Sequence, residues 1–534
     1  MSVLPPTIEA AIGARLDILP EREKKLLQVG AVIGKEFPAA LAREVAGISE
    51  GEARELFGHL CALDLVKAST TVLGAGFAFR HPLIQEVCYT MQLRSRRIAL
   101  HAAVADAIAE SEWGYLDEFA GLLAHHYEAA GKTTAAARHL IRSATWIGRT
   151  NAGEALSQSK KTRQLLGSQA APRDVEVMRA IASASVLTFG WRVGMTPDEA
   201  DPYAEEALRY AREFADDEAG PEVLMQYGRF KASTGSADAY AALMQEALAM
   251  PVTDLGRTAT IQGCLAQAHW MSGFLLKAEA ACDAALKTLL IRRRQGINGI
   301  VGLDSPPYTS FDVELWISRL KARILVWLGR FDEANVLLGD AFRAEGTNRE
   351  APVVQFIAYL ASVELACHRN DPVAAHRHAE RIRAYADQSD IPYLHVYALF
   401  ASARAKTCSN ARAEAVRDLQ AGLEFAAAAN PGREYQAHLL AELSYAQYGN
   451  GLFREAAETA RTAIEMARDR HHRTAECLAS MVHGAGIARG KRTVVNGVAQ
   501  QYLARAEDLF CQTGAALLAP RLETLRTDMT ARLH

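Results

Sequence analysis

One tripeptide of this chain has residue types that hold nucleotide phosphates. Gly131, Lys132 and Thr133 match the end of a GxxxxGK[ST] loop, whose backbone N–H groups and lysine contact the phosphates. That loop needs a second glycine five residues before Gly131, where this chain has His126, and it needs a preceding strand, which the sequence does not indicate. The spacing instead predicts a turn between two helices.

Histidines and cysteines do not form a recognisable metal or nucleophile motif. His125–His126 and His471–His472 are adjacent pairs, whereas two ligands on one helix need a spacing of three or four residues to reach one ion. The chain has no GxSxG elbow, no cysteine beside a histidine in a recognised motif, and no paired aspartates in a sheet-rich, cyclase-like domain. We therefore expect no catalytic residues, no metal, no cofactor and no enzyme activity of the chain's own.

The composition favours a helical protein in a reducing compartment. Half of the 534 residues are apolar, only 7% are aromatic and alanine is abundant, which suits helices that pack closely through small side chains. The eight cysteines are scattered without a CxxC pair, so we expect buried thiols and a cytoplasmic location. A formal net charge of -3 and the lack of any long apolar segment favour neither a nucleic acid nor a membrane as partner.

Small residues recur in a repeat of about forty residues. They stand at positions i, i+4 and i+7, which places each trio on one helical face. Successive trios begin 56, 41, 40, 41 and 43 residues apart, and weaker members begin at Ala200 and Tyr240. The long interval contains 291–310, whose Gly, Pro and Ser content predicts an inserted loop. The trios are Ala278/Cys282/Ala285, Ala334/Leu338/Ala341, Ala375/Ala379/Ile382, Ala415/Leu419/Gly422, Ala456/Ala460/Ala463 and Ala499/Leu503/Ala506.

A glycine or an asparagine stands five residues before most trios. Both residue types accept a left-handed backbone at the end of a helix, so each unit is predicted to be helix, tight turn, helix. The segments GRFDEANVLLGDAF and GLFREAAETARTAI resemble the second halves of tetratricopeptide repeats, although the unit is longer than that family's and its first-helix Trp-Leu-Gly-Tyr pattern is mostly missing. The turn residues are Gly235, Gly273, Gly329, Asn370, Asn410 and Gly451.

Residues 1–112 follow a different pattern. Three apolar stretches at 19–34, 37–47 and 49–64 predict helices, and β-prone runs at 65–72 and 77–81 predict a hairpin. Three helices followed by a hairpin are typical of a winged helix. The predicted fold is therefore mainly α: a winged-helix domain at 1–112, connecting helices with a first repeat-like pair at 113–170, and a right-handed tetratricopeptide-like α-solenoid at 171–534.

Winged helices often bind DNA, and the charge of this one argues against that role. Residues 1–112 contain twelve Lys or Arg and fourteen Asp or Glu. The candidate recognition helix has Glu50, Glu52 and Glu55 against Arg54 alone, and carboxylates repel phosphates. A transcriptional regulator that binds DNA stays the alternative function.

The segments LPPTIEAAIGARLDILPEREKKLLQVGAVIGKEF and FAFRHPLIQEVCYTMQLRSRRIALHAAVADAIAE resemble the region after the ATPase module in signal-transduction ATPases, especially bacterial proteins with a class III adenylate/guanylate cyclase domain. FGWRVGMTPDEADPYAEEA and PPYTSFDVELWISRLKARILVWLGRFDEA are similar to their repeats. The resemblance implies that the enzyme modules belong upstream of Met1, in a longer gene or a separate chain. It also implies that His81, with Arg80, senses nucleotide on an ATPase module in trans.

The leading hypothesis is a non-catalytic regulatory arm whose solenoid binds a protein or small-molecule signal. Large aromatic side chains and arginine in or beside irregular segments are candidate binding anchors, since such residues dominate protein interfaces. Packing in the core is the other role open to them. The candidates are Trp191, Arg192, Tyr308 and Trp316.

Overall fold

The chain divides into two compact units. One comprises Met1–Ser143 with Gln164–Ser168, and the other comprises Ala144–Arg163 with Gln169–His534, so the division falls inside the segment predicted to connect two domains. Each unit is described by itself. The computed structural model describes residues 6–71, 74–111, 117–167, 171–213, 219–234, 237–302, 309, 311–343, 346–347, 351–389, 391–429, 432–490 and 496–533.

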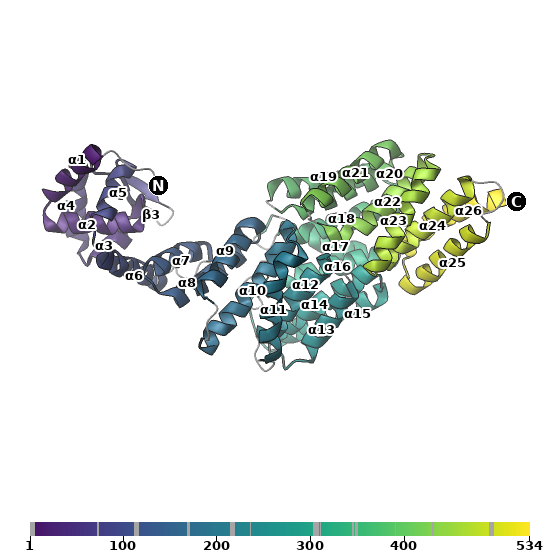
Figure 1. The fold of residues 1–534 in the computed structure, drawn as a ribbon, viewed down its shortest axis with the longest axis horizontal. Helices are drawn as coiled ribbons and strands as arrows, with labels where there is room; N and C mark the ends of the chain where they lie inside the picture. Colours follow the sequence, from purple (N-terminus) through teal and green to yellow (C-terminus); the bar gives the residue numbers. More distant parts are fainter. Residues whose placement is uncertain are drawn as a thin grey trace. The chain divides into compact units, whose positions relative to one another are not determined.

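The N-terminal unit contains a three-stranded antiparallel sheet among helices (Figure 1). The strand order is β1-β3-β2, with Phe37 opposite Phe77 and Val66 opposite Phe79. The three predicted helices and two predicted strands correspond to α2, α3, α4, β2 and β3. The elements are α1 (Pro6–Asp17), α2 (Glu21–Ile33), β1 (Glu36–Pro38), α3 (Ala39–Ala46), α4 (Glu50–Ala62), β2 (Val66–Thr71), β3 (Gly74–Phe79), α5 (Pro82–Thr90), α6 (Arg94–Glu110), η2 (Asp117–Phe119), α7 (Ala120–Ala129) and α8 (Thr133–Ile147).

Local sequence signals set several of these elements. The hydroxyl of Ser49 accepts a hydrogen bond from the N–H of Glu52 and caps α4, as its place before an apolar run predicts. Phe37 lies within 6.1 Å of Phe57 and 5.5 Å of Phe79, between ring centroids, and joins the sheet to α4. The tripeptide 131–133 forms the turn from α7 to α8, where Gly131 has a φ of 73°.

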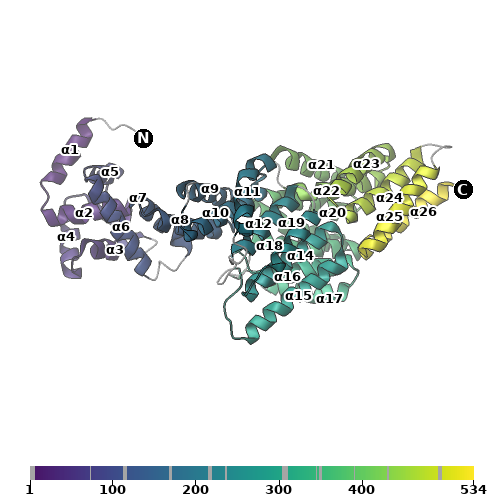
Figure 2. The same cartoon turned by 60° about the horizontal axis from the view of Figure 1, so that its bottom comes forward.

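The C-terminal unit is a series of helix pairs, and from α10 (Arg173–Val193) to α25 (Asn496–Thr513) each helix packs against the next (Figures 1 and 2). First helices of consecutive pairs also contact one another, as α16 contacts α18 and α22 contacts α24. The helices are α9 (Ala152–Leu165), α10 (Arg173–Val193), α11 (Pro197–Glu213), α12 (Ala219–Thr234), α13 (Ala237–Ala249), α14 (Leu255–Ser272), α15 (Leu275–Arg294), α16 (Val313–Trp327), α17 (Phe331–Arg343), α18 (Pro352–His368), α19 (Pro372–Gln388), α20 (Tyr393–Cys408), α21 (Arg412–Ala429), η3 (Arg433–Tyr435), α22 (Gln436–Gly449), α23 (Phe453–Asp469), α24 (Arg473–Gly490), α25 (Asn496–Thr513), η4 (Ala516–Leu518) and α26 (Ala519–Leu533).

The predicted repeat is confirmed in detail. The trios lie in the second helix of each pair, and those in α15, α19 and α23 are buried at all three positions. The turn residues Gly273, Gly329, Asn370, Asn410 and Gly451 all have a left-handed backbone, with φ between 54° and 82°. Gly235 lies outside the described residues. The fold is an α-solenoid of tetratricopeptide-like helix pairs.

Part of the loop prediction for 291–310 is wrong, because helix α15 continues to Arg294. Arg292 turns back from the end of this helix, and its guanidinium donates to the carbonyls of Ile297, Asn298 and Gly299 at 2.9–3.2 Å. The Arg292 side chain therefore holds the start of the loop, and it is buried. Residues 303–308 and 310 lie outside the described residues.

Segments about 200 residues apart meet across the solenoid. The guanidinium of Arg473, just inside α24, donates to the carbonyl of Ser272 at 3.0 Å and lies 3.4 Å from a carboxylate oxygen of Asp238. Its Cζ also lies 4.2 Å from the centroid of the Phe274 ring. In the same way η3 packs on α12 and η4 packs on α16. The winding of the pairs therefore encloses the faces of the first helices.

Candidate ligand-binding cavity

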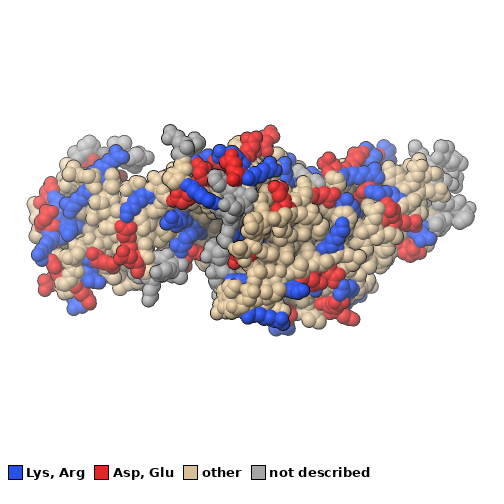
Figure 3. Space-filling model, turned by 90° about the horizontal axis from the view of Figure 1, so that it is seen from below, with Lys and Arg blue, Asp and Glu red and all other residues tan. Residues whose placement is uncertain are grey.

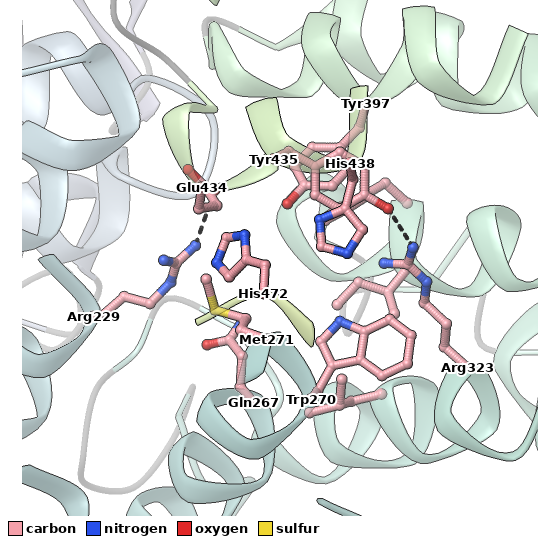
Figure 4. Close-up of a pocket in the computed structure, with 13 residues that line it drawn as sticks. Arg229, Gln267, Trp270, Met271, Arg323, Tyr397, Glu434, Tyr435, His438 and His472 are labelled. Carbon is pink, nitrogen blue, oxygen red and sulfur yellow. Dashed lines mark hydrogen bonds and ion pairs between the residues drawn. The ribbon is translucent and has the colours of Figure 1, made fainter. Parts of the chain in front are cut away.

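The enclosed faces of the first helices surround a small cavity (Figure 4). Its walls come from α12, α14, α16, α18, α20, η3 and α22, together with His472 before α24. The space between these atoms is about 510 Å³ including the part open to solvent, and the centre of a water-sized sphere reaches about 50 Å³ of it. The cavity therefore has room for a few waters or for one compact ligand group.

Aromatic rings form much of the cavity wall. The ring centroids of Tyr397 and Tyr435 lie 4.5 Å apart, and those of Tyr397 and Phe356 lie 4.8 Å apart. The ring of Trp270, another lining residue, packs edge-to-face on that of Trp327. Burial raises the pKa of the Tyr435 hydroxyl to about 12, so it stays neutral. Such walls suit a flat, mostly uncharged ligand group.

Two arginines reach this cavity, each with a carboxylate partner. Arg323 donates to both carboxylate oxygens of the fully buried Glu364, at 2.8 and 3.1 Å, and to the hydroxyl of Tyr435 at 2.6 Å. Arg229 donates from Nη2 to Glu434 Oε1 at 3.3 Å. Burial alone would lower the pKa of Arg229, but the Glu434 carboxylate holds it above its ordinary value. The cavity is therefore close to neutral overall.

Two histidines complete the polar lining. His438 stacks on Tyr435 with centroids 4.9 Å apart, and its Nε2 lies 3.1 Å from the Thr474 hydroxyl. Burial, with Arg323 nearby, lowers the pKa of His438 to about 4. His472 is 1% exposed, and burial lowers its pKa well below the ordinary value. Both imidazoles are neutral at physiological pH and can each donate and accept a hydrogen bond.

Several polar atoms of this lining have no hydrogen-bond partner among the described residues. They are Arg229 Nη1, Glu434 Oε2, His438 Nδ1 and both ring nitrogens of His472. A buried donor or acceptor left without a partner costs about 1–3 kcal/mol, and native structures contain few of them. Five such atoms belong to residues that line this one cavity.

The predicted binding anchors are not on the surface. Trp191, Arg192 and Trp316 are only 6–7% exposed, which agrees with the core-packing role left open for them, and their role in binding a partner stays a prediction. Trp316 packs against Gly263 between α14 and α16. Trp191 nevertheless supports the cavity, because the Arg229 guanidinium carbon lies 3.7 Å from its ring centroid. Tyr308 lies outside the described residues.

His81 and Arg80 are exposed at the junction of β3 and α5 in the N-terminal unit. His81 is the N-cap of α5, and its Nδ1 accepts a hydrogen bond from the N–H of Leu83 at 3.2 Å. In the neutral ring this leaves Nε2–H as a donor. Arg80 lies 3.0 Å from a carboxylate oxygen of Asp64. The capping role is thus observed, and the nucleotide-sensing role stays a prediction.

A second group of histidines lies in the N-terminal unit. Ligand atoms of His101, His125 and His126 lie within 4.8 Å of one another. His101 lies in α6, whereas His125 and His126 lie in α7. The spacing of histidines along a single helix therefore did not indicate this cluster. The Nδ1 atoms of His101 and His126 lie 2.9 Å apart, and His101 Nε2 lies 3.0 Å from the Tyr89 hydroxyl. Burial lowers the pKa of His101 to about 4 and that of His126 to about 3, so they pair as neutral rings.

Charged side chains of both signs occur among the described surface residues. On the face drawn in Figure 3, basic and acidic side chains are interspersed. In the N-terminal unit, Arg54 of α4 pairs with Glu50 at 3.2 Å, and Arg22 pairs with Glu52. Among the helices in the described ranges, none combines the length and hydropathy needed to cross a membrane.

Comparison with known proteins found no matching family model and no significant match among curated proteins. Among solved structures, a Rap protein complexed with competence and sporulation factor is similar over 76% of this chain and 99% of its own, with a TM-score of 0.39 and 13% identity. A signal transduction ATPase with numerous domains and a tetratricopeptide repeat sensor, from Pyrococcus horikoshii, is similar over 99% of this chain and 68% of its own, with a TM-score of 0.35 and 12% identity. The class of this protein, a tetratricopeptide-like helical-repeat protein, rests on its own helices, trios and turns.

Sequence analysis missed the residues of the cavity. One signal was available, because Arg323 lies within the apolar helix LWISRLKARILVWL, where a buried cation needs a partner. The partner could not be identified, since Glu364 and Tyr435 are 41 and 112 residues away.

Proposed function

We propose that this chain is a non-catalytic regulatory arm that binds a small-molecule or peptide signal in the cavity enclosed by its solenoid. The observation that carries this proposal is the aromatic cavity, whose lining residues also hold five buried polar atoms without a hydrogen-bond partner among the described residues. Helices from α12 to α22 and His472 before α24 contribute to the wall, so a ligand there would contact many repeats at once. Occupancy would therefore change how tightly the solenoid is wound.

Thermal unfolding tests the ligand site. The assay uses a defined panel of neutral, anionic, cationic and zwitterionic small molecules and short peptides. A ligand present at 100 times its Kd stabilises the native state by about 2.7 kcal/mol, which raises the Tm measurably. The expected result is at least one class of compound that raises the Tm and alters the fluorescence of Trp270, with neither effect in Arg229→Met/Glu434→Leu. A panel without any such compound would contradict the proposal.

The N-terminal unit is proposed to be a winged helix that works with an ATPase module, either on another chain or encoded upstream. The order of its helices and strands supports this, and so does the exposed His81 at a helix N-terminus, where a phosphate is favoured. An in-frame GxxxxGK[ST] in the DNA upstream of Met1 would identify the module. The purified chain should not hydrolyse ATP. Turnover that His81→Ala abolishes would overturn the non-catalytic proposal.

Binding of DNA through α4 is the alternative, and the pairing of its only arginine disfavours it. Since Arg54 is engaged by Glu50, the helix offers carboxylates to a phosphate backbone. A gel shift with genomic fragments at physiological salt separates the two functions. Retention of a specific fragment by the wild type, lost in Arg54→Ala, would favour a transcriptional regulator.

A further inference from the structure

Two helices of the N-terminal unit bring three imidazoles together. His101 comes from α6, and His125 and His126 come from adjacent positions of α7. One ligand nitrogen of each ring lies within 4.8 Å of those of the other two. The expectation of no metal was based on the spacing of histidines along one helix. It does not apply to ligands that come from two helices.

The closest pair of nitrogens is already near the separation that a metal ion requires. His101 Nδ1 and His126 Nδ1 lie 2.9 Å apart and share a hydrogen bond. Two nitrogens bound to one tetrahedral Zn²⁺ at about 2.0–2.1 Å lie about 3.3 Å from each other. The hydrogen bond uses one hydrogen and one lone pair. An ion between the rings takes the place of that hydrogen, which then resides on Nε2 of its own ring.

The Tyr89 hydroxyl favours the ring form of His101 that a metal needs. Its oxygen lies 3.0 Å from His101 Nε2. When Nε2 carries the hydrogen and donates it to this oxygen, Nδ1 keeps its lone pair on the side of His126. Metal-bound histidines almost always donate their other ring N–H to a neighbouring acceptor in this way.

The exposure of the three rings suits a bound ion. His101 is 2% exposed and His126 is fully buried, whereas His125 is exposed. The two buried rings are held by the packing of α6 on α7, so they are positioned before an ion arrives. The exposed ring can rotate to close its remaining distance, and its side of the cluster gives the ion a route from solvent.

We propose that His101, His125 and His126 bind one Zn²⁺ ion, with water as the fourth ligand, and that this ion joins α6 to α7. Imidazole nitrogens suit Zn²⁺, whereas Mg²⁺ and Ca²⁺ prefer oxygen ligands. Zn²⁺ has no geometric preference from its d electrons, so it accepts the arrangement that the two helices impose. This inference does not depend on the ligand cavity of the C-terminal unit.

Calorimetric titration of the full chain with zinc chloride tests the site. One ion per chain is expected to bind with a Kd of about 10 μM or tighter. The Arg97 guanidinium carbon lies 4.8 Å from the centroid of the Tyr89 ring, and its positive charge keeps the affinity moderate. Zinc should raise the Tm, and magnesium chloride at the same concentration should not. A weaker affinity for zinc, or equal binding of magnesium, would overturn the proposal.

X-ray absorption of the zinc-loaded chain measures the ligands directly. The expected spectrum has Zn–N distances of about 2.0–2.1 Å and the scattering of three imidazoles. A first shell made of oxygen atoms alone, or one that contains sulfur, would overturn the assignment.

His125→Ala is the decisive variant, because this side chain is exposed and its removal leaves the core intact. It is expected to weaken zinc binding at least about tenfold and to keep the wild-type Tm without zinc. His101→Gln should weaken zinc binding as much. His139→Gln is the matched control, since that ring is partly buried in the same unit and stacks on Tyr127 but is not in the cluster. Wild-type affinity in His125→Ala, or loss of binding in His139→Gln, would place the ion elsewhere and overturn the proposal.

Discussion

His438 and His472 lie beside one another in the cavity wall, with ring centroids 5.4 Å apart. Each is kept neutral by burial, and Arg323 opposes protonation of His438 while Glu442 favours it. In the unfolded chain both rings titrate as ordinary histidines. The folded solenoid therefore binds fewer protons than the unfolded chain at mildly acidic pH.

Acid should destabilise the solenoid through these rings. Because the pKa of His438 falls from 6.5 to about 4 on folding, its contribution to stability is lost as pH falls from about 6.5 to about 4, and changes little below that. The loss reaches about 3 kcal/mol for a shift of this size. The free energy of unfolding measured against pH should fall less steeply in His438→Phe.

The left-handed turn at Asn370 gives a second prediction at this scale. Its φ of 54° is accepted by glycine and asparagine, whereas a β-branched residue is strained there. Asn370→Val should lower the free energy of unfolding by about 1–2 kcal/mol, and Asn370→Gly should change it by less than about 0.5 kcal/mol. Chemical unfolding measures both. An equal loss of unfolding free energy in the two variants would show that the asparagine side chain, rather than the backbone conformation, stabilises this turn.

At the scale of elements, neighbouring first helices pack closely through small residues. Gly263 of α14 lies against Trp316 and Ile317 of α16, and a Cβ at this glycine would lie 2.7 Å from the Trp316 ring. Trp316 is thus a packing residue between two repeats. In α17, by contrast, a Cβ at Gly339 would meet only the end of the Arg343 side chain, at 3.6 Å.

Alanine at these two glycines should have opposite effects. Gly263→Ala should lower the free energy of unfolding by about 1–2 kcal/mol, because overpacking outweighs the gain in helix propensity. Gly339→Ala should raise it by about 0.5–1 kcal/mol, since only the propensity changes. Urea unfolding of the two variants measures both. Stabilisation by Gly263→Ala would mean that α14 and α16 are further apart than described.

At the scale of the C-terminal unit, the solenoid is closed by contacts between segments distant in the chain. Arg473 joins α24 to the end of α14, and the Arg229–Glu434 pair joins α12 to η3. The cavity is enclosed because of these contacts. The ligand proposed for this cavity would therefore be coupled to the closure of the solenoid.

Removing the Arg473 contacts should loosen this closure. Arg473→Met keeps the side-chain stem and loses the hydrogen bond to Ser272 and the ion pair with Asp238, at a cost of about 1–2 kcal/mol. Amide hydrogen exchange should become faster in α13 and α14 and stay unchanged in α18 and α19. Arg454→Met, which breaks an exposed pair within α23, should change exchange little. Uniformly faster exchange would indicate global destabilisation instead.

The sequence by itself determined the repeat, the helix pairs and the turns. The spacing of the trios and the Gly or Asn before each of them are local properties. A helix has a fixed period, and few residue types accept the left-handed backbone of the turn. The order of helices and strands at 19–81 followed in the same way. Lying beside an irregular segment does not determine whether an aromatic side chain is exposed. Trp191 and Trp316 lie beside such segments and are buried between helices.

Only the tertiary structure decided the site. Arg229 and Glu434 are 205 residues apart, and Arg323 and Tyr435 are 112 apart. Whether they meet depends on the rotation between successive helix pairs, summed over several repeats. Contacts between neighbouring helices, such as that of Trp316 with Gly263, set this rotation. The spacing of the repeats along the sequence does not reveal it. A local pattern therefore fixed the repeating unit, while the winding of the units placed the polar groups around one cavity.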